Sequence, residues 1–307
     1  MKISTQLMFD RGSAQMSTVQ NKLTQTQAQL AQGKQVINAS DAPDQAATIQ
    51  RLKSVLNRQD SYQSSLNTLK NRMLGEESTL QSVSDLLVRA KEVAVQGATD
   101  TLNAGDRKAL GQEMQALRDQ MLSLANTKDS NGNYLFAGSR VKQPAFSEIA
   151  NGSLVYLGDQ TRMNVRVGEQ RSIAVNRTGT DAFVSVPRID KDGASVGIGF
   201  FKVMDDLIAG LNNVKGDDIR RGVGELDALQ TGVSLAQAQV GTNLNVVDQQ
   251  TAVIEDTTLN LKTTLSSIED LDYASAITKM NQQMMSLEAA QSSFAKVSQL
   301  SLFNYIK

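Results

Sequence analysis

The chain has 307 residues, and its 31 basic and 32 acidic side chains nearly cancel, so charge gives no argument for binding nucleic acid or an anionic membrane surface. It contains no His, no Cys and no Trp, which removes the usual general base of enzymes, thiolate nucleophiles, disulfides and the common zinc sites. We therefore expect a protein that is not an enzyme and binds no cofactor and no metal.

The first predicted helix carries an apolar column with a spacing of seven residues, formed by Phe9, Met16, Leu23, Leu30 and Ile37. Val19 and Thr26 occupy the alternating inner position, as in a coiled-coil-like seam. The other faces consist of Gln, Thr, Ser and Asn instead of the charged pairs of a water-facing coiled coil. Such a face is compatible both with solvent and with contact to neighbouring subunits.

The segment NASDAPDQAATI interrupts this helix and starts another, because Asn38, Ser40 and Asp41 are N-cap residues and Pro43 suits a first helical turn. Leucine and methionine then recur at multiples of seven, which predicts a helix over about 44–98. A further helix is expected over about 105–127, since apolar residues continue at helical spacing there.

The period changes near residue 129, where DSNGN indicates a turn. The same letters resemble the start of a calcium-binding loop, but Arg140 stands where that loop needs Glu and Tyr134 where it needs Gly. Beyond Pro144 apolar and polar residues alternate between frequent turns, so residues 143–196 are predicted to be a small β-rich insert. Three Asn-X-Ser/Thr triplets are attributed to chance.

Helical patterns return from GFFKVMDDLIAGLNNV onward, and the last seventy residues carry a seam like the first. Acidic pairs such as Asp205–Asp206, Asp217–Asp218 and Glu269–Asp270 have no nucleophile beside them and are interpreted as solvated or capping residues. The Met-rich stretch MNQQMMSLEAAQSSF suits either a coiled-coil core or an adaptable binding face.

Because neither terminal seam can bury its stripe alone, the two are expected to pair with each other or with another chain, or to stay disordered until assembly. The predicted fold is mainly α with a small β-rich insert: an elongated rod of long paired N- and C-terminal helices, coiled-coil-like, with the β domain at the distal end. The assembly interface is predicted along both seams, at Phe9, Met16, Leu23, Leu30, Ile37, Ile277, Met280, Met284, Leu287, Phe294, Leu302, Phe303 and Tyr305.

Four segments resemble the flagellin-related axial proteins of bacterial flagella, and among them the hook–filament junction proteins. These are the opening MKISTQLMF, GKQVINASDAPDQAA, NGNYLFAGSRVKQPAF and the closing SLFNYIK. The resemblance covers almost the whole chain and is loose only over 143–196. Flagellin shares the layout, but its typical opening, its NSAKDDAAG-like stretch and its ending differ from those seen here.

The resemblance implies a flagellin-like fold in which residues 1–43 and 267–307 form an inner domain that lines the export channel. Residues 44–142 and 197–266 would form a helical rod domain, and 143–196 a surface domain. It also implies an extracellular structural adaptor in which about eleven copies form a ring on hook-associated protein 1 and present a surface to flagellin.

Export would use the flagellar type III route, with a chaperone at the C-terminal helix. The N-terminus lacks the apolar run of a cleaved secretory signal, and no stretch approaches the ~20 apolar residues that span a bilayer, which fits that route and no membrane insertion. Two alternatives stay open: a minor flagellin of the filament, and a cytosolic coiled-coil scaffold.

Overall fold

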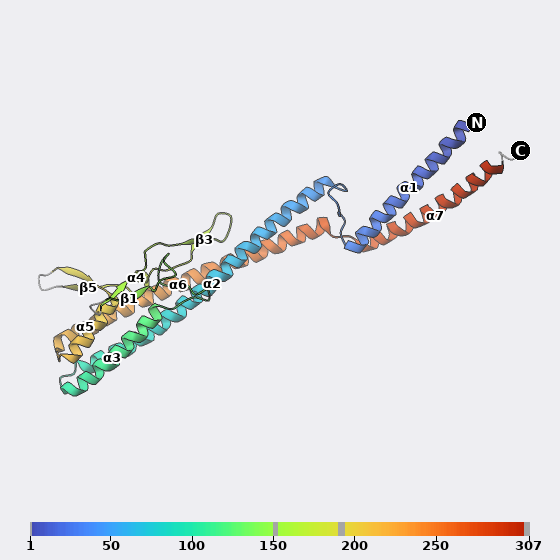
Figure 1. The fold of residues 1–307 in the computed structure, drawn as a ribbon. Helices are drawn as coiled ribbons and strands as arrows, with labels where there is room; N and C mark the ends of the chain where they lie inside the picture. The colour runs from blue at the N-terminus through green and yellow to red at the C-terminus, as the bar shows by residue number, and fades with distance from the viewer. Residues whose placement is uncertain (1, 150–152, 190–193, 304–307) are drawn as a thin grey trace. The chain divides into compact units, whose positions relative to one another are not determined.

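The computed structural model describes residues 2–149, 153–189 and 194–303. Its long helices are α1 (Lys2–Gln32), α2 (Pro43–Gly97), α3 (Ala104–Ala125), α6 (Gly216–Glu269) and α7 (Tyr273–Phe303), as Figure 1 shows. The shorter helices are α4 (Gly179–Ala182) and α5 (Phe200–Asn212). Across these described residues, no helix combines the length and apolar character needed to cross a membrane.

Two compact units make up the fold. The terminal unit consists of the residues up to 59 together with those from 255 onward, and the central unit consists of residues 60–254. The mainly α prediction is confirmed, and the predicted helices over 44–98 and 105–127 agree with α2 and α3 to within two residues. Pro43 begins α2 as expected. Asp44 lies in the first turn, where a negative carboxylate interacts favourably with the positive end of the helix dipole.

The central unit has a closed apolar core between α2, α3, α5 and α6. Leu80 of α2, Met114 of α3 and Val233 of α6 are each fully buried. The heptad positions predicted on α2, such as Leu80, are therefore buried in this core. Asn103 starts α3 by accepting a hydrogen bond from the backbone N–H of Asp106, which satisfies one of the free donors at that helix end.

The β-rich insert is confirmed, but its strands form three separate antiparallel pairs instead of one sheet. The strands are β1 (Phe146–Glu148), β2 (Leu154–Tyr156), β3 (Asn164–Arg166), β4 (Ser172–Ala174), β5 (Val186–Ile189) and β6 (Ser195–Ile198). β1 pairs with β2, β3 with β4, and β5 with β6. In the β3–β4 pair, the apolar residues Val165 and Ile173 lie opposite each other, in line with the predicted alternation. Strands of three or four residues are too short to build a core of their own.

An aromatic cluster joins the β1–β2 pair to the helices of the central unit. The ring of Phe146 lies 5.3 Å from Phe183 and 5.1 Å from Phe201 between centroids, in edge-to-face arrangements. The ring centroid of Phe136, which follows the predicted turn, lies 5.4 Å from that of Phe183. The DSNGN segment is a turn, as predicted, because Asp129 Oδ1 accepts hydrogen bonds from the backbone N–H groups of Asn131 and Asn133.

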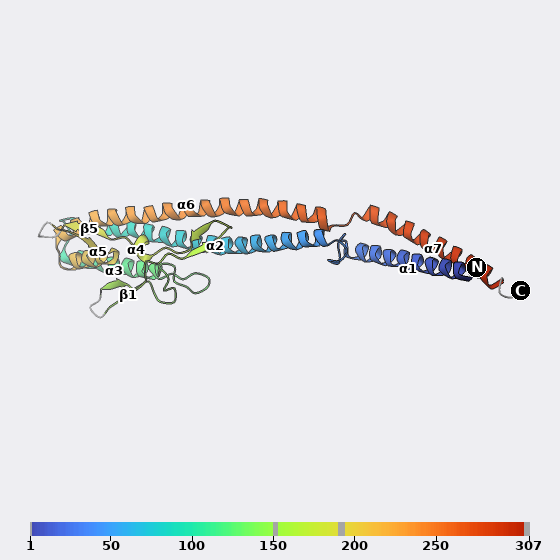
Figure 2. The same ribbon diagram turned by 90° about the horizontal axis from the view of Figure 1, so that it is seen from above.

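In the terminal unit, α1 packs alongside α7, and both views in Figures 1 and 2 show the two helices side by side. This confirms the predicted pairing of the two ends of the chain. The prediction that the helix continues to Ile37 is wrong, because α1 ends at Gln32. Gly33 has φ +66°, a left-handed conformation that ends a helix, and its carbonyl accepts a hydrogen bond from Leu271 N–H at 3.0 Å.

Candidate assembly surface

The contact between α1 and α7 includes two phenylalanines, one near the start of α1 and one near the end of α7. The ring centroids of Phe9 and Phe294 are 4.5 Å apart and the rings are tilted by 46°. Gly12 lies beside the same ring, since a Cβ atom at this position would stand 3.4 Å from Phe294. The sequence periodicity thus brings the two predicted columns together, as expected for a coiled-coil-like pair.

Much of this seam stays open to solvent. Phe9 is 45 % exposed, Ile277 46 % and Met284 42 %. The remaining described seam residues within the two helices are only half-buried: Met16, Leu23, Leu30, Met280, Leu287 and Phe294. Two helices cover only one side of each other, so an apolar strip remains uncovered along the pair.

Three predicted seam residues lie at the end of the chain. Leu302 and Phe303 belong to the last turn of α7, but their side chains are outside the described part of the structure. Tyr305 lies outside the described residues altogether. The assignment of these three to an assembly interface stays a prediction.

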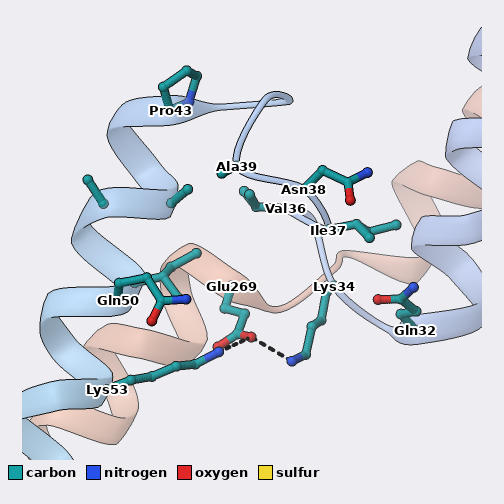
Figure 3. A pocket seen from close by; sticks show the side chains of 13 residues that line it. Gln32, Lys34, Val36, Ile37, Asn38, Ala39, Pro43, Gln50, Lys53 and Glu269 are labelled. Carbon is teal, nitrogen blue, oxygen red and sulfur yellow. Dashed lines mark hydrogen bonds and ion pairs between the residues drawn. The ribbon is translucent and has the colours of Figure 1, made fainter.

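A pocket of about 420 Å³ lies where the segment after α1 passes the start of α2 and the end of α6 (Figure 3). Its apolar walls include Val36, Ile37 and Ile49. Glu269, the last residue of α6, is 7 % exposed, and its Oε1 atom receives the ammonium groups of Lys34 at 2.7 Å and Lys53 at 2.8 Å. Ile37 therefore lines this pocket instead of extending the helical column.

The electrostatics of the pocket are dominated by these three charges. Burial alone would raise the pKa of Glu269, but hydrogen bonds from Lys34 and Lys53 outweigh it and hold the pKa below its usual range. The backbone adds to the link, because Gln35 N–H donates to the carbonyl of Glu269 at 2.8 Å. Two cations share one anion, so the charged side chains that line the pocket sum to one positive charge.

The interpretation of the acidic pairs as solvated or capping residues is wrong for two of the three. Glu269 is buried as described, and Asp205 and Asp206 form ion pairs with Arg118 at 2.8 Å and with Arg188 at 2.6 Å. Asp217 and Asp218 do lie in the first turn of α6, as expected for capping residues. Spacing along the chain could not show the ion pairs, because their arginines are separated from them by 18 and 87 residues.

Comparison with known proteins identifies this arrangement of terminal helices. Residues 3–141 match the bacterial flagellin N-terminal helical region, and residues 223–306 match the bacterial flagellin C-terminal helical region. Together these matches cover all of α2, α3 and α7 and most of α1 and α6. The chain belongs to the flagellin-related family of bacterial flagellar proteins, which are structural components of an organelle outside the cell.

Within that family, the chain is similar over its whole length to hook-associated proteins. It is 29 % identical to Flagellar hook-associated protein 3 of Escherichia coli, with 100 % of both chains covered. It is 27 % identical to the protein of the same name from Salmonella typhimurium, with 99 % of both covered. The crystal structure of flagellar hook-associated protein 3 from Legionella pneumophila has the same fold, with a TM-score of 0.66 at 19 % identity over 72 % of this chain and 98 % of that one.

Proposed function

We propose that this protein is the structural adaptor that joins the hook of the bacterial flagellum to its filament. The observation that carries the proposal is the end-to-end similarity to hook-associated protein 3 from two organisms. Open apolar seams support it, since a subunit whose terminal helices are half-buried gains buried surface when neighbours pack against them.

In this proposal about eleven copies form a closed ring on hook-associated protein 1, and the ring offers flagellin a surface on which to assemble. Residues 1–43 and 267–307 line the central channel, 44–142 and 197–266 form the rod around it, and 143–196 face outward. The half-buried seam residues, among them Leu23, Leu30 and Leu287, then contact neighbouring subunits. Leu302, Phe303 and Tyr305 extend the same interface.

Export in this proposal uses the flagellar type III apparatus, which carries unfolded chains to the growing tip without a cleaved signal. A chaperone holds the C-terminal helix before export. The exposed methionines of α7 suit that role, because Met284 and Met285 are 42 % and 62 % exposed and thioether side chains adapt to varied partners.

A deletion of the gene tests the proposal. The strain should build hooks without filaments and release flagellin monomers into the medium, and the intact gene supplied in trans should restore filaments. Labelled protein should be found at the hook–filament junction of isolated flagella. Normal filaments on the deletion strain would contradict the adaptor function.

A minor flagellin is the second candidate, favoured by the match of both terminal regions to bacterial flagellin helical regions. It predicts protein distributed along the filament and purified chain that polymerises alone into long filaments. Labelling confined to the junction would exclude it.

A further inference from the structure

We infer that the pocket at Lys34, Lys53 and Glu269 receives Leu259 and its flanking acidic residues from a second copy of this chain. The inference deepens the proposed function, because it rests on assembly of many copies and names one contact between them. It would link a pocket on one copy to a projecting residue on the next.

The pocket is shaped and charged for an apolar side chain with a carboxylate beside it. Its apolar wall is formed by Val36, Ile37, Ala47 and Ile49, and its polar rim by the two lysines that share Glu269. Figure 3 shows Lys34 and Lys53 reaching Glu269 from opposite sides. Because one carboxylate serves two ammonium groups, a further carboxylate brought to this rim is attracted instead of repelled.

Leu259 has the complementary character. It is 64 % exposed on α6, the most exposed leucine among the large hydrophobic side chains of the described residues. Glu255 and Asp256, both exposed, precede it by four and three residues, so all three side chains lie on one face of the helix. Lys262, also exposed, follows Leu259 by three residues on the same face. The patch therefore presents one apolar side chain between two carboxylates and one ammonium group, and it carries one net negative charge.

Leu259 cannot occupy the pocket of its own copy. Leu259 and Glu269 belong to the same continuous helix, and ten residues of α-helix separate them by about 15 Å along the axis. Only another copy can bring the acidic patch to the lysines. A pocket on one copy that meets a projection on the next is a head-to-tail contact, which repeats into a closed ring or a helical array.

Cysteine cross-linking tests the contact directly, since the chain has no Cys of its own. The double variant Ala47→Cys/Leu259→Cys is supplied to the deletion strain, and isolated flagella are oxidised mildly and run without reductant. We expect a ladder of covalent multimers of this chain from the double variant and none from either single variant. Ala39→Cys, on another wall of the pocket, replaces Ala47→Cys if that variant does not assemble.

Absence of multimers from both double variants on flagella that carry filaments would overturn the inference while leaving the adaptor function intact. Cross-links to a different flagellar protein would overturn it as well, because the occupant would then not be a second copy. Loss of the adaptor function would be seen separately, as normal filaments in the deletion strain.

A matched pair of surface variants gives a second readout. Leu259→Ser should lower the amount of chain retained on isolated flagella by about tenfold, as expected for losing the burial of one leucine. Leu235→Ser, at a 61 % exposed leucine of the same helix within the central unit, should leave that amount unchanged. Equal retention of the two variants would contradict the proposed contact.

Discussion

The terminal and central units share the same heptad spacing of apolar residues but differ in how far these residues are buried. Both are built on helices with apolar residues at multiples of seven, yet Leu80, Met114 and Val233 are fully buried in the central unit while Phe9 and Met284 of the terminal unit are 45 % and 42 % exposed. The difference lies in the number of neighbours. In the central unit, helices and strand pairs surround each seam, whereas α1 and α7 have mainly each other.

Polar groups show the same contrast. In the central unit, buried arginines such as Arg72, Arg118 and Arg177 have carboxylate or amide partners. The surfaces of α1 and α7 carry few charges and many Gln, Thr and Ser side chains. We infer that the central unit is stable in the free chain and that the α1/α7 pair depends on neighbouring subunits.

The largest expected effect is a difference in unfolding free energy between a substitution in the central unit and one in the terminal unit. Leu80→Ala should lower the free energy of unfolding by about 3 kcal/mol, because it leaves a cavity in a closed core. Met284→Ala should change it by less than about 0.5 kcal/mol in the free chain, because that residue is already 42 % exposed and no closed core surrounds it. Urea unfolding of the two variants measures both values, and similar losses would contradict the contrast drawn between the units.

The second prediction concerns pH and the central unit. Burial raises the pKa of Glu76 from 4.5 to about 7, and the nearby guanidinium groups of Arg72 and Arg177 offset this only partly. The folded chain therefore holds a proton that the unfolded chain has lost between these values. Stability should fall by up to about 3 kcal/mol as pH rises from about 4.5 through about 7, and it should recover on acidification within that window.

Glu76→Gln should remove this slope, because the amide is neutral at every pH. Urea unfolding at about pH 5 and about pH 8 measures the slope, and Glu77→Gln, at the next, exposed position, is the control. A slope that persists in Glu76→Gln would assign the pH dependence to another group.

The third prediction concerns the turn that ends α1. Gly33→Ala should destabilise the terminal unit by about 1–2 kcal/mol, since φ is +66° and the new Cβ would stand 2.6 Å from the hydroxyl oxygen of Tyr273. Limited proteolysis should then cut near residue 33 faster while the central unit keeps its resistance. Gly241→Ala, in open space on α6, is the control and should be neutral or slightly stabilising.

The smallest expected effect belongs to the surface ion pairs. Lys70→Met removes the partner of Asp248, but both side chains are about half exposed, and such pairs contribute at most about 1 kcal/mol. The unfolding free energy should therefore change little at physiological salt. A loss as large as that of Leu80→Ala would show that charge, and not apolar burial, sets the stability of the central unit.

Periodicity was sufficient to predict the helices, because residues such as Leu66, Met73, Leu80 and Leu87 repeat over many turns and bury a single face. It could not show that the column stops before Ile37, since Gly33 ends the helix by its backbone conformation while the spacing of apolar residues continues. The separate strand pairs could not be predicted from the sequence either, because short alternating segments do not reveal which strands pair.

The pocket in the terminal unit was missed for a related reason. Lys34, Lys53 and Glu269 are far apart in the sequence, and only the packing of three chain segments brings them together. Lysine and glutamate are common surface residues, so neither type signals burial. The one available signal was that Lys34 interrupts a stretch of the chain that is otherwise poor in charge.

Hydrogen exchange on the full-length chain, free in solution and then within isolated flagella, tests the central claim most directly. In the free chain, backbone amides of α1 and α7 should exchange at least about 100 times faster than those of α2 between residues 66 and 94, and assembly should slow α1 and α7 specifically. Equal protection of the two regions in the free chain, unchanged on assembly, would contradict the account.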